Sequence, residues 1–212
     1  MKTDIITIYS DLKGREEAID AAERFIAYNS IEGKAAMHIR LLTEEAVGMV
    51  HGIMDGFKGS LWLESEAAPK GICCRICLIA ESPVSEYQED RLLKVSTSGK
   101  NEEAKGILGK IRELIRTSAQ RPIASFDNDS AGELDDWYYM GAPHGETRMI
   151  DDYYVGYWSL DSYREAVNSK PAAKITEDMH DELERSIIAK LADDVKVFLK
   201  ADSTKVVIEK II

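Results

Sequence analysis

Two adjacent glutamates, Glu44 and Glu45, interrupt a strongly apolar helical pattern that reads LLTEEAVGMVHGIM at residues 41–54. In a helix, Leu42, Glu45 and Met49 share one face because they are spaced by three and four residues. Such a face should pack on a sheet, where a carboxylate is costly unless it is solvated, paired or hydrogen-bonded. Glu45 is therefore expected either to line a pocket or to be a paired structural carboxylate, whereas Glu44 is expected in solvent. Met49 has the character of an ordinary core residue.

The three cysteines, Cys73, Cys74 and Cys77, lie within GICCRICLIA, and a Cys-x-x-Cys spacing can indicate redox or zinc chemistry. This segment has the composition of a buried strand, in which Cys74 and Cys77 point to opposite faces. Cys73 and Cys77 share a face but lie about 13 Å apart at the usual strand rise. The sequence has no second cysteine pair. We therefore expect buried structural thiols rather than a metal or redox site.

Other reactive residue types form no recognisable set. The four histidines show no ligand pattern, and no Ser/His/Asp or Cys/His constellation can be placed. Between Asp127 and Asp152 there are eight acidic residues and a single basic one, Arg148. This segment is expected to be a solvated acidic loop, since no metal-ligand spacing occurs in it. Aromatic residues flank it and are expected in the core or, where exposed, on a protein-binding surface: Trp137, Tyr138, Tyr139, Tyr153, Tyr154, Tyr157 and Trp158.

The elements that must position these residues follow from hydrophobic periodicity and turn residues. Strands are predicted at 4–10, 60–66, 72–80 and 153–158, and in a closing hairpin over 195–212 that turns at 201–204. Helices are predicted at 15–28, 34–54, 107–115, 160–167 and 176–192. The polar segment 83–105 is predicted to be a flexible loop. Because strands and helices do not alternate, we expect an α/β two-layer sandwich: a mixed, mainly antiparallel sheet with helices on one face.

Two stretches carry a resemblance to a known family. EEAVGMV, at 44–50, resembles the N-box helix of the superfamily of gyrase, heat-shock chaperone, histidine kinase and mismatch-repair ATPases, particularly the small bacterial anti-sigma serine kinases. KGILGKIRELI, at 105–115, resembles the second glycine box of this superfamily. The order of strands, helices and hairpins is also similar over about 1–118 and 177–212. The resemblance implies one histidine kinase-like ATPase domain over 1–212, with an insertion at about 119–176.

The resemblance also implies an ATP site with particular roles. Glu45 matches the glutamate that polarises the attacking water or hydroxyl as a general base. Met49 falls where the family has the asparagine that holds magnesium, and Glu81 falls where an aspartate accepts a hydrogen bond from the adenine amino group. Gly106 and Gly109 match glycines whose backbone amides face phosphates at a helix N-terminus, although glycines here would equally permit close helix packing.

The ATP lid is implied at STSGKN, residues 96–101, where Ser98, Gly99 and Lys100 would approach the nucleotide and Lys100 would meet a phosphate. Three positions depart from the family pattern. A thioether at Met49 does not replace an amide oxygen on hard magnesium. Pro83, in place of a glycine, lacks an N–H and has a fixed φ. Glu81 is one methylene longer than aspartate. The sequence therefore predicts ATP binding without an ordinary magnesium site and with weak or no hydrolysis.

Composition limits the classes of function. The chain has 212 residues, 44% of them hydrophobic and 31% charged, with a formal net charge of −11. This charge disfavours binding to nucleic acid or to an anionic membrane surface. No apolar run reaches the length of a transmembrane helix, and the first residues have no signal-peptide pattern, so a cytoplasmic location is expected.

Three hypotheses for the function follow. The first is an ATPase-like regulatory protein that binds nucleotide weakly and contacts a protein partner through residues 119–158, with a homodimer as a further option. The second is a non-catalytic protein-interaction module on the same fold. The third is a serine kinase of the anti-sigma type.

Overall fold

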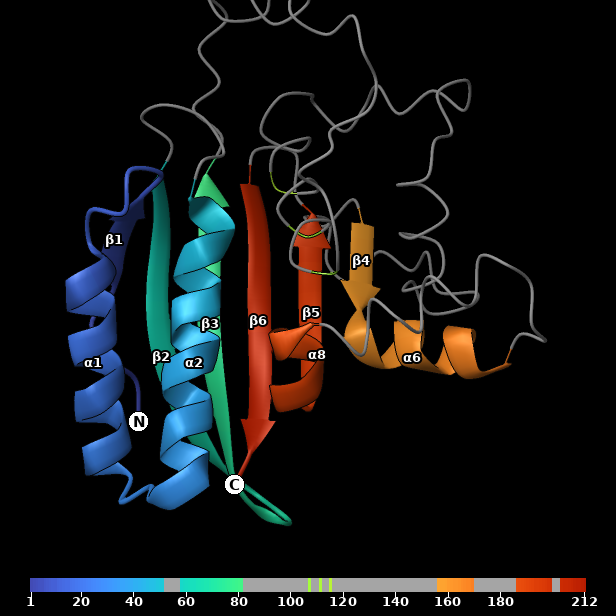
Figure 1. The fold of residues 1–212 in the computed structure, drawn as a ribbon, viewed down its shortest axis with the longest axis horizontal. Helices are drawn as coiled ribbons and strands as arrows, with labels where there is room; N and C mark the ends of the chain where they lie inside the picture. The colour runs from blue at the N-terminus through green and yellow to red at the C-terminus, as the bar shows by residue number, and fades with distance from the viewer. Residues whose placement is uncertain are drawn as a thin grey trace, which may run out of the picture.

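The computed structural model of the chain describes residues 1–51, 58–81, 156–169, 186–199 and 203–212, and singly Ile107, Ile111 and Ile115. The six strands of this part form one sheet in the order β1-β2-β3-β6-β5-β4 (Figure 1). They are β1 (Ile6–Tyr9), β2 (Lys58–Ala68), β3 (Gly71–Glu81), β4 (Gly156–Ser159), β5 (Asp194–Leu199) and β6 (Ser203–Ile211). The helices are α1 (Arg15–Tyr28), α2 (Gly33–Val50), α6 (Leu160–Ser169) and α8 (Ile187–Leu191).

The predicted α/β two-layer sandwich is confirmed, but the sheet is not mixed: each neighbouring pair of described strands is antiparallel. The connection between β1 and β2 shows why. Two antiparallel helices, α1 and α2, join these strands, so the chain reverses its direction three times between β1 and β2 (Figure 1). A parallel pair is normally joined by one crossover helix, whereas the second helix here returns the chain for antiparallel pairing.

The hydrophobic core lies between the sheet and the helix layer. α1, α2 and α8 cover one face of the sheet (Figure 1), and their apolar side chains join those of the strands in one buried cluster. The largest completely buried members are Trp158 of β4 and Tyr163 of α6. They are followed by Phe25, Ile39, Leu42 and Met49 from the helices, and Ile8, Leu61, Leu63 and Ile76 from the strands. Burial alternates at the start of β2 and β6, as expected for a sheet with one covered face, but residues 61–63 and 206–208 are all buried because Trp62 and Val207 pack in a small cluster on the other face.

The predicted helix over 34–54 is too long at its C-terminus. α2 ends at Val50, and His51 has the extended backbone angles φ −61° and ψ 129°. The ring nitrogen Nδ1 of His51 lies 2.9 Å from the carbonyl oxygen of Ser10, at the end of β1. The helix therefore ends where His51 contacts Ser10, although the hydrophobic periodicity of the sequence continues beyond this residue.

The turn between β1 and α1 covers the free edge of the sheet. The backbone N–H of Tyr9 donates to the carbonyl of Lys13 over 3.0 Å, and that of Leu12 donates to the carbonyl of Tyr9 over 3.0 Å. Gly14 then lies directly against the carbonyl of Thr7, so closely that an added Cβ would be 2.1 Å from its oxygen. A covered edge is protected from pairing with another strand.

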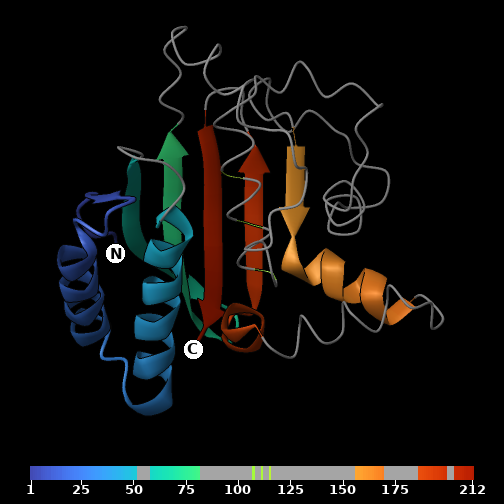
Figure 2. The same cartoon turned by 45° about the horizontal axis from the view of Figure 1, so that its top comes forward.

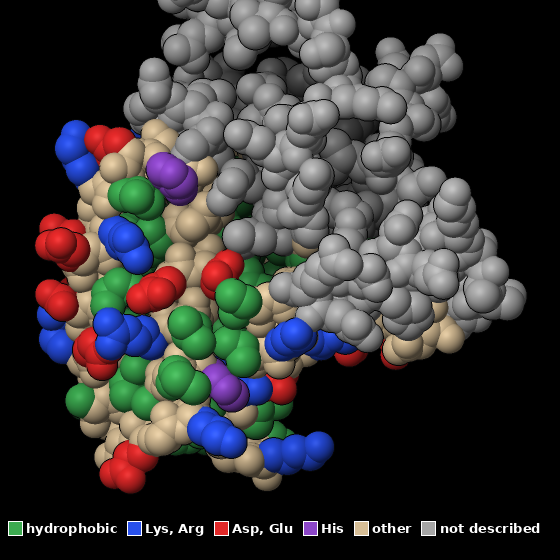
Figure 3. All heavy atoms as spheres, in the orientation of Figure 1, with side chains coloured by type: hydrophobic (Ala, Val, Ile, Leu, Met, Phe, Trp, Pro, Cys, Tyr) green, Lys and Arg blue, Asp and Glu red, His purple; other side chains and the backbone are tan. Residues whose placement is uncertain are grey.

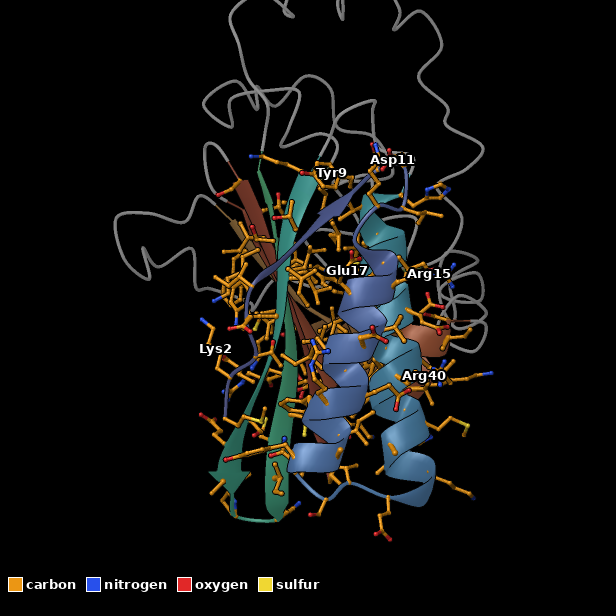
Figure 4. The ribbon with its side chains drawn as sticks, turned by 90° about the vertical axis from the view of Figure 1, so that its left-hand side faces the viewer. Lys2, Tyr9, Asp11, Arg15, Glu17 and Arg40 are labelled. Atoms are coloured by element: carbon orange, nitrogen blue, oxygen red, sulfur yellow. The ribbon has the colours of Figure 1, made fainter. Side chains whose placement is uncertain are left out.

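The opposite face of the sheet carries a ladder of charges, far less apolar surface, and no covering helix among the described elements (Figure 4). Glu64, Arg75 and Glu209 are cross-strand neighbours on β2, β3 and β6. The Nε of Arg75 donates to Glu209 over 2.9 Å, and its guanidinium also pairs with Glu64 and Glu66. Lys196 Nζ lies 2.8 Å from Glu209, which links β5 to the ladder.

Part of the range expected to be an insertion belongs to the main sheet and core. β4 pairs with β5, and Trp158 and Tyr163 are completely buried, with ring centroids 6.0 Å apart. The guanidinium of Arg164 on α6 donates to the backbone carbonyls of Ala189, Ala192 and Asp193. Residues 119–155 and 170–176 of that range lie outside the described part of the chain.

Replacing Arg164 with alanine is expected to weaken the attachment of α6 to the end of α8. Three carbonyls would lose a charged donor, and hydrogen bonds of this type typically contribute about 1.5–3 kcal/mol. Because the side chain is partly exposed, we expect the free energy of unfolding to fall by about 2 kcal/mol, measured by urea denaturation. Arg164→Lys should recover only part of this loss, because an ammonium lacks the fork of donors. An alanine variant as stable as the parent would contradict this role.

Candidate functional site

Glu45 is positioned by the packing of α2. The buried side chains of this helix face the sheet, and Thr43 satisfies its hydroxyl by donating to the carbonyl of Ile39 over 2.9 Å. Glu44 is partly exposed and lies 3.7 Å from Arg40, which also pairs with Glu23 of α1 at 3.0 Å. Successive helical residues are about 100° apart around the axis. Glu45 is therefore turned away from the α1 side.

Glu45 itself is half-buried, like its neighbour Glu44, so it is neither sealed in the core nor fully exposed. Its helical position is four residues before Met49, on the same side of α2. α2 also packs against α8. The two sequence-based alternatives, a pocket residue and a paired structural carboxylate, are both compatible with this burial.

Met49 is completely buried within the main core cluster. The next residue, Val50, has its Cγ2 only 3.3 Å from where a Cβ would stand on Gly59 of β2. The last turn of α2 is therefore pressed onto the sheet, and the thioether of Met49 is surrounded by apolar packing. As a packing residue, Met49 is explained without any ligand.

The structure brings the end of α2 close to the end of β3. Gly59, which the last turn of α2 contacts, is the cross-strand partner of Ala80, and Glu81 follows directly as the last residue of β3. Glu81 is in turn the cross-strand partner of Ser203. Glu45 and Glu81, to which the resemblance assigns the general base and the adenine acceptor, thus lie on two elements, α2 and β3, whose ends are close together.

The predicted helix over 107–115 is supported at three positions. Ile107, Ile111 and Ile115 are helical and essentially completely buried, and they join the same core cluster as Met49. Figure 2 shows the helices that bound this core, α1, α2 and α8, on one side of the sheet. The other candidate residues, Ser98, Gly99, Lys100, Gly106 and Gly109, lie outside the described residues, as does Pro83.

The cysteines have the environment that the sequence predicts. Cys74 belongs to the main core and Cys77 to the small cluster on the opposite face, so they point to opposite sides of the sheet. Burial raises the pKa of Cys74 to about 11 and that of Cys77 to about 12, and it also raises the pKa of Cys73. These thiols are protonated at neutral pH and are poor nucleophiles.

The sequence analysis missed the charge ladder around Arg75. The sequence pattern that could have indicated the ladder is the charged residues on β2, β3 and β6. These residues are seen to be neighbours only once the strand register is known. Hydrogen bonds from Arg75 lower the pKa of Glu66. Burial opposes the charged form of Glu209, but hydrogen bonds from Lys196 and Arg75 outweigh it and lower its pKa. The ladder is satisfied internally and serves stability.

The outer surface of the helix layer has a mixed character. Figure 3 shows acidic, basic and apolar side chains interspersed over α1 and α2, without a stretch of one charge. Within the ranges described, no group of three His, Cys, Asp or Glu side chains is arranged to hold a metal ion. The described helices also include none that is long and apolar enough to cross a membrane.

Comparison with known proteins adds no relative. No protein-family model matches the chain, and no curated protein or solved structure matches it. Its described residues form an α/β two-layer sandwich with a six-stranded antiparallel sheet.

Proposed function

We propose that this chain is an ATPase-like regulatory protein that binds an adenine nucleotide beside α2 without efficient hydrolysis or phosphotransfer. The observation that carries the proposal is the half-buried Glu45 on a helix that ends against the last residues of β3. Partial burial of a carboxylate costs free energy unless the charge is paired, hydrogen-bonded or solvated. Ionisable groups in such environments are found most often at functional sites. The segment 119–158 is proposed to contact a protein partner.

The absence of efficient turnover is part of the proposal because of Met49. Charge on a transferring phosphoryl group needs a compensating cation, and metal ions normally supply much of that compensation. A completely buried thioether offers none of it. The chain would therefore report nucleotide occupancy by a change in stability or partner affinity rather than by consuming ATP.

A second candidate function is a non-catalytic interaction module with its pocket filled by side chains. The complete burial of Met49 together with Ile107 and Ile111 favours this alternative, because these side chains occupy the layer in which a ligand would lie. The two functions differ in one measurable property: only the first predicts that a nucleotide stabilises the folded chain.

Saturating ATP or ADP is expected to stabilise the chain. A ligand present at a hundred times its dissociation constant adds about 2.7 kcal/mol to the free energy of unfolding. For a chain of this size, that corresponds to a rise in Tm of about 5–10 °C, measurable by calorimetry. Magnesium chloride alone is the control and should have no effect of this size. A flat result with both nucleotides would exclude the regulator and leave the interaction module.

Glu45→Ala tests whether the bound nucleotide lies beside α2. Removing a negative charge near the phosphates should leave nucleotide affinity unchanged or increase it, as measured by isothermal titration. Glu44→Ala is the matched control, since it makes the same change one residue away on the side of Arg40, and it should leave affinity unchanged. If instead the parent transfers phosphate to a protein serine and Glu45→Ala abolishes this transfer, the anti-sigma-type kinase replaces the regulator.

A further inference from the structure

The family resemblance implies a magnesium ion held at residue 49, and the structure allows a test of whether this residue fits that role. Met49 has no exposed surface and lies in the main apolar cluster beneath α2. Magnesium requires near-octahedral oxygen ligation and usually keeps several water molecules. A position without solvent access offers neither the water nor the oxygen, and the thioether is a soft ligand. The residue does not fit the ion.

The last turn of α2, which carries Met49, is held in place by packing on the sheet. Val50 contacts the sheet at Gly59, so the last turn of α2 is held down on β2. Bringing the side chain of residue 49 to the surface would require rotation of this turn and would expose Val50 and Ala46, which are also buried. Burying a divalent ion beside these residues would incur the large cost of an unpaired charge in an apolar environment.

We infer that residue 49 provides no divalent-cation position in this fold, and that a nucleotide beside Glu45 is bound without a metal ion bridging it to this residue. The first half of this inference concerns Met49 alone, and only the second half rests on the proposed function. It follows that stabilisation by ATP should be the same in magnesium and in excess EDTA, within about 1 °C of Tm.

The test uses Mn²⁺ as a paramagnetic probe on the full chain carrying ¹³C-labelled methionine methyl groups. Met37, which is 53% exposed on the same helix, provides the reference signal for non-specific relaxation. The Met49 signal is assigned by its disappearance in Met49→Leu. In the absence of ATP, which would itself carry Mn²⁺ to the site, we expect substoichiometric Mn²⁺ to broaden Met49 no more than Met37. Selective broadening of Met49 would overturn the inference.

Two further arms separate this inference from the proposed function. Loss of all ATP-dependent stabilisation in the parent would remove the proposed function, while an unbroadened Met49 signal would still support the absence of a metal position. Met49→Asn introduces the amide that the family has at this position. It is expected to lower the Tm by several degrees, because an amide buried in this apolar cluster lacks hydrogen-bond partners. It should not make ATP binding magnesium-dependent. Met49→Leu controls for packing and should change the Tm little. An asparagine variant that keeps its Tm and gains magnesium-dependent binding would overturn the inference.

Discussion

Replacing Gly14 with alanine is expected to be among the most destabilising single substitutions in this chain. Gly14 has φ +82°, in the left-handed region, and an added Cβ would stand 2.1 Å from the carbonyl oxygen of Thr7. The clash is with backbone and cannot be relieved by a side-chain rotation. Left-handed strain and displacement of the turn together should cost about 3–5 kcal/mol, measured by urea denaturation.

Gly33→Ala is the matched control for the strain alone. Gly33 has φ +60°, also left-handed, but no atom lies within 4 Å of an added Cβ. Its replacement should cost only about 1–2 kcal/mol. Similar losses in the two variants would show that the contact with Thr7 is not what requires glycine. The larger loss at Gly14 should also expose the edge of β1, and would appear as greater aggregation on heating.

Arg75→Leu is expected to produce the second large effect. Arg75 is only 25% exposed, and its guanidinium is the shared cation of Glu64, Glu66 and Glu209. Without it, these carboxylates face each other on neighbouring strands, with Lys196 as their remaining cation among the described contacts. Removing one partner from a well-buried ion pair typically costs about 3–5 kcal/mol. With partial exposure taken into account, we expect a loss of about 2–3 kcal/mol at pH 7.

The cost of Arg75→Leu should depend on pH in a defined direction. Glu66 and Glu209 have pKa values below their usual 4.5, so their contribution to stability is present above pH 4.5 and is lost as the pH falls through the lowered pKa values. Asp194 has the opposite effect on stability. Burial raises its pKa above 3.8, so its charged form destabilises the fold at neutral pH, and protonation at low pH removes this destabilisation. The stability difference between parent and variant should therefore shrink below pH 4.5.

Arg40→Leu is the control for charge removal. Arg40 also bridges two glutamates, Glu23 and Glu44, but it is 53% exposed on the helix layer. Figure 4 shows it on the opposite side of the molecule from Lys2, which lies on the open side of the sheet. Exposed pairs contribute about 0.2–1 kcal/mol, so this variant should be nearly as stable as the parent. Equal losses for Arg40 and Arg75 would contradict the role assigned to the ladder.

Local pattern was sufficient for most of the elements. The helix predicted at 15–28 is α1 with the same bounds, and the hairpins β2–β3 and β5–β6 lie where alternation and turn residues placed them. Opposite faces for Cys74 and Cys77 were also predictable, because a strand has a period of two. These features depend on residues that are near one another in the chain.

Other features could not be predicted because they depend on segments that are distant in the sequence. α2 ends where His51 reaches the carbonyl of Ser10, forty-one residues away, and no local signal marks that end. β4 and α6 belong to the sheet and core because of their contacts with β5 and α8, although the family resemblance placed them in an insertion.

The sequence by itself therefore determined which segments are strands and helices, and that one glutamate of α2 must lie beside its apolar stripe. Tertiary structure alone decided that each described strand pair is antiparallel, with no parallel pair among them, and that Arg75 meets Glu209 from 134 residues away. The physical reason is that periodicity specifies which side of an element is buried, whereas strand pairing specifies which buried and charged side chains meet.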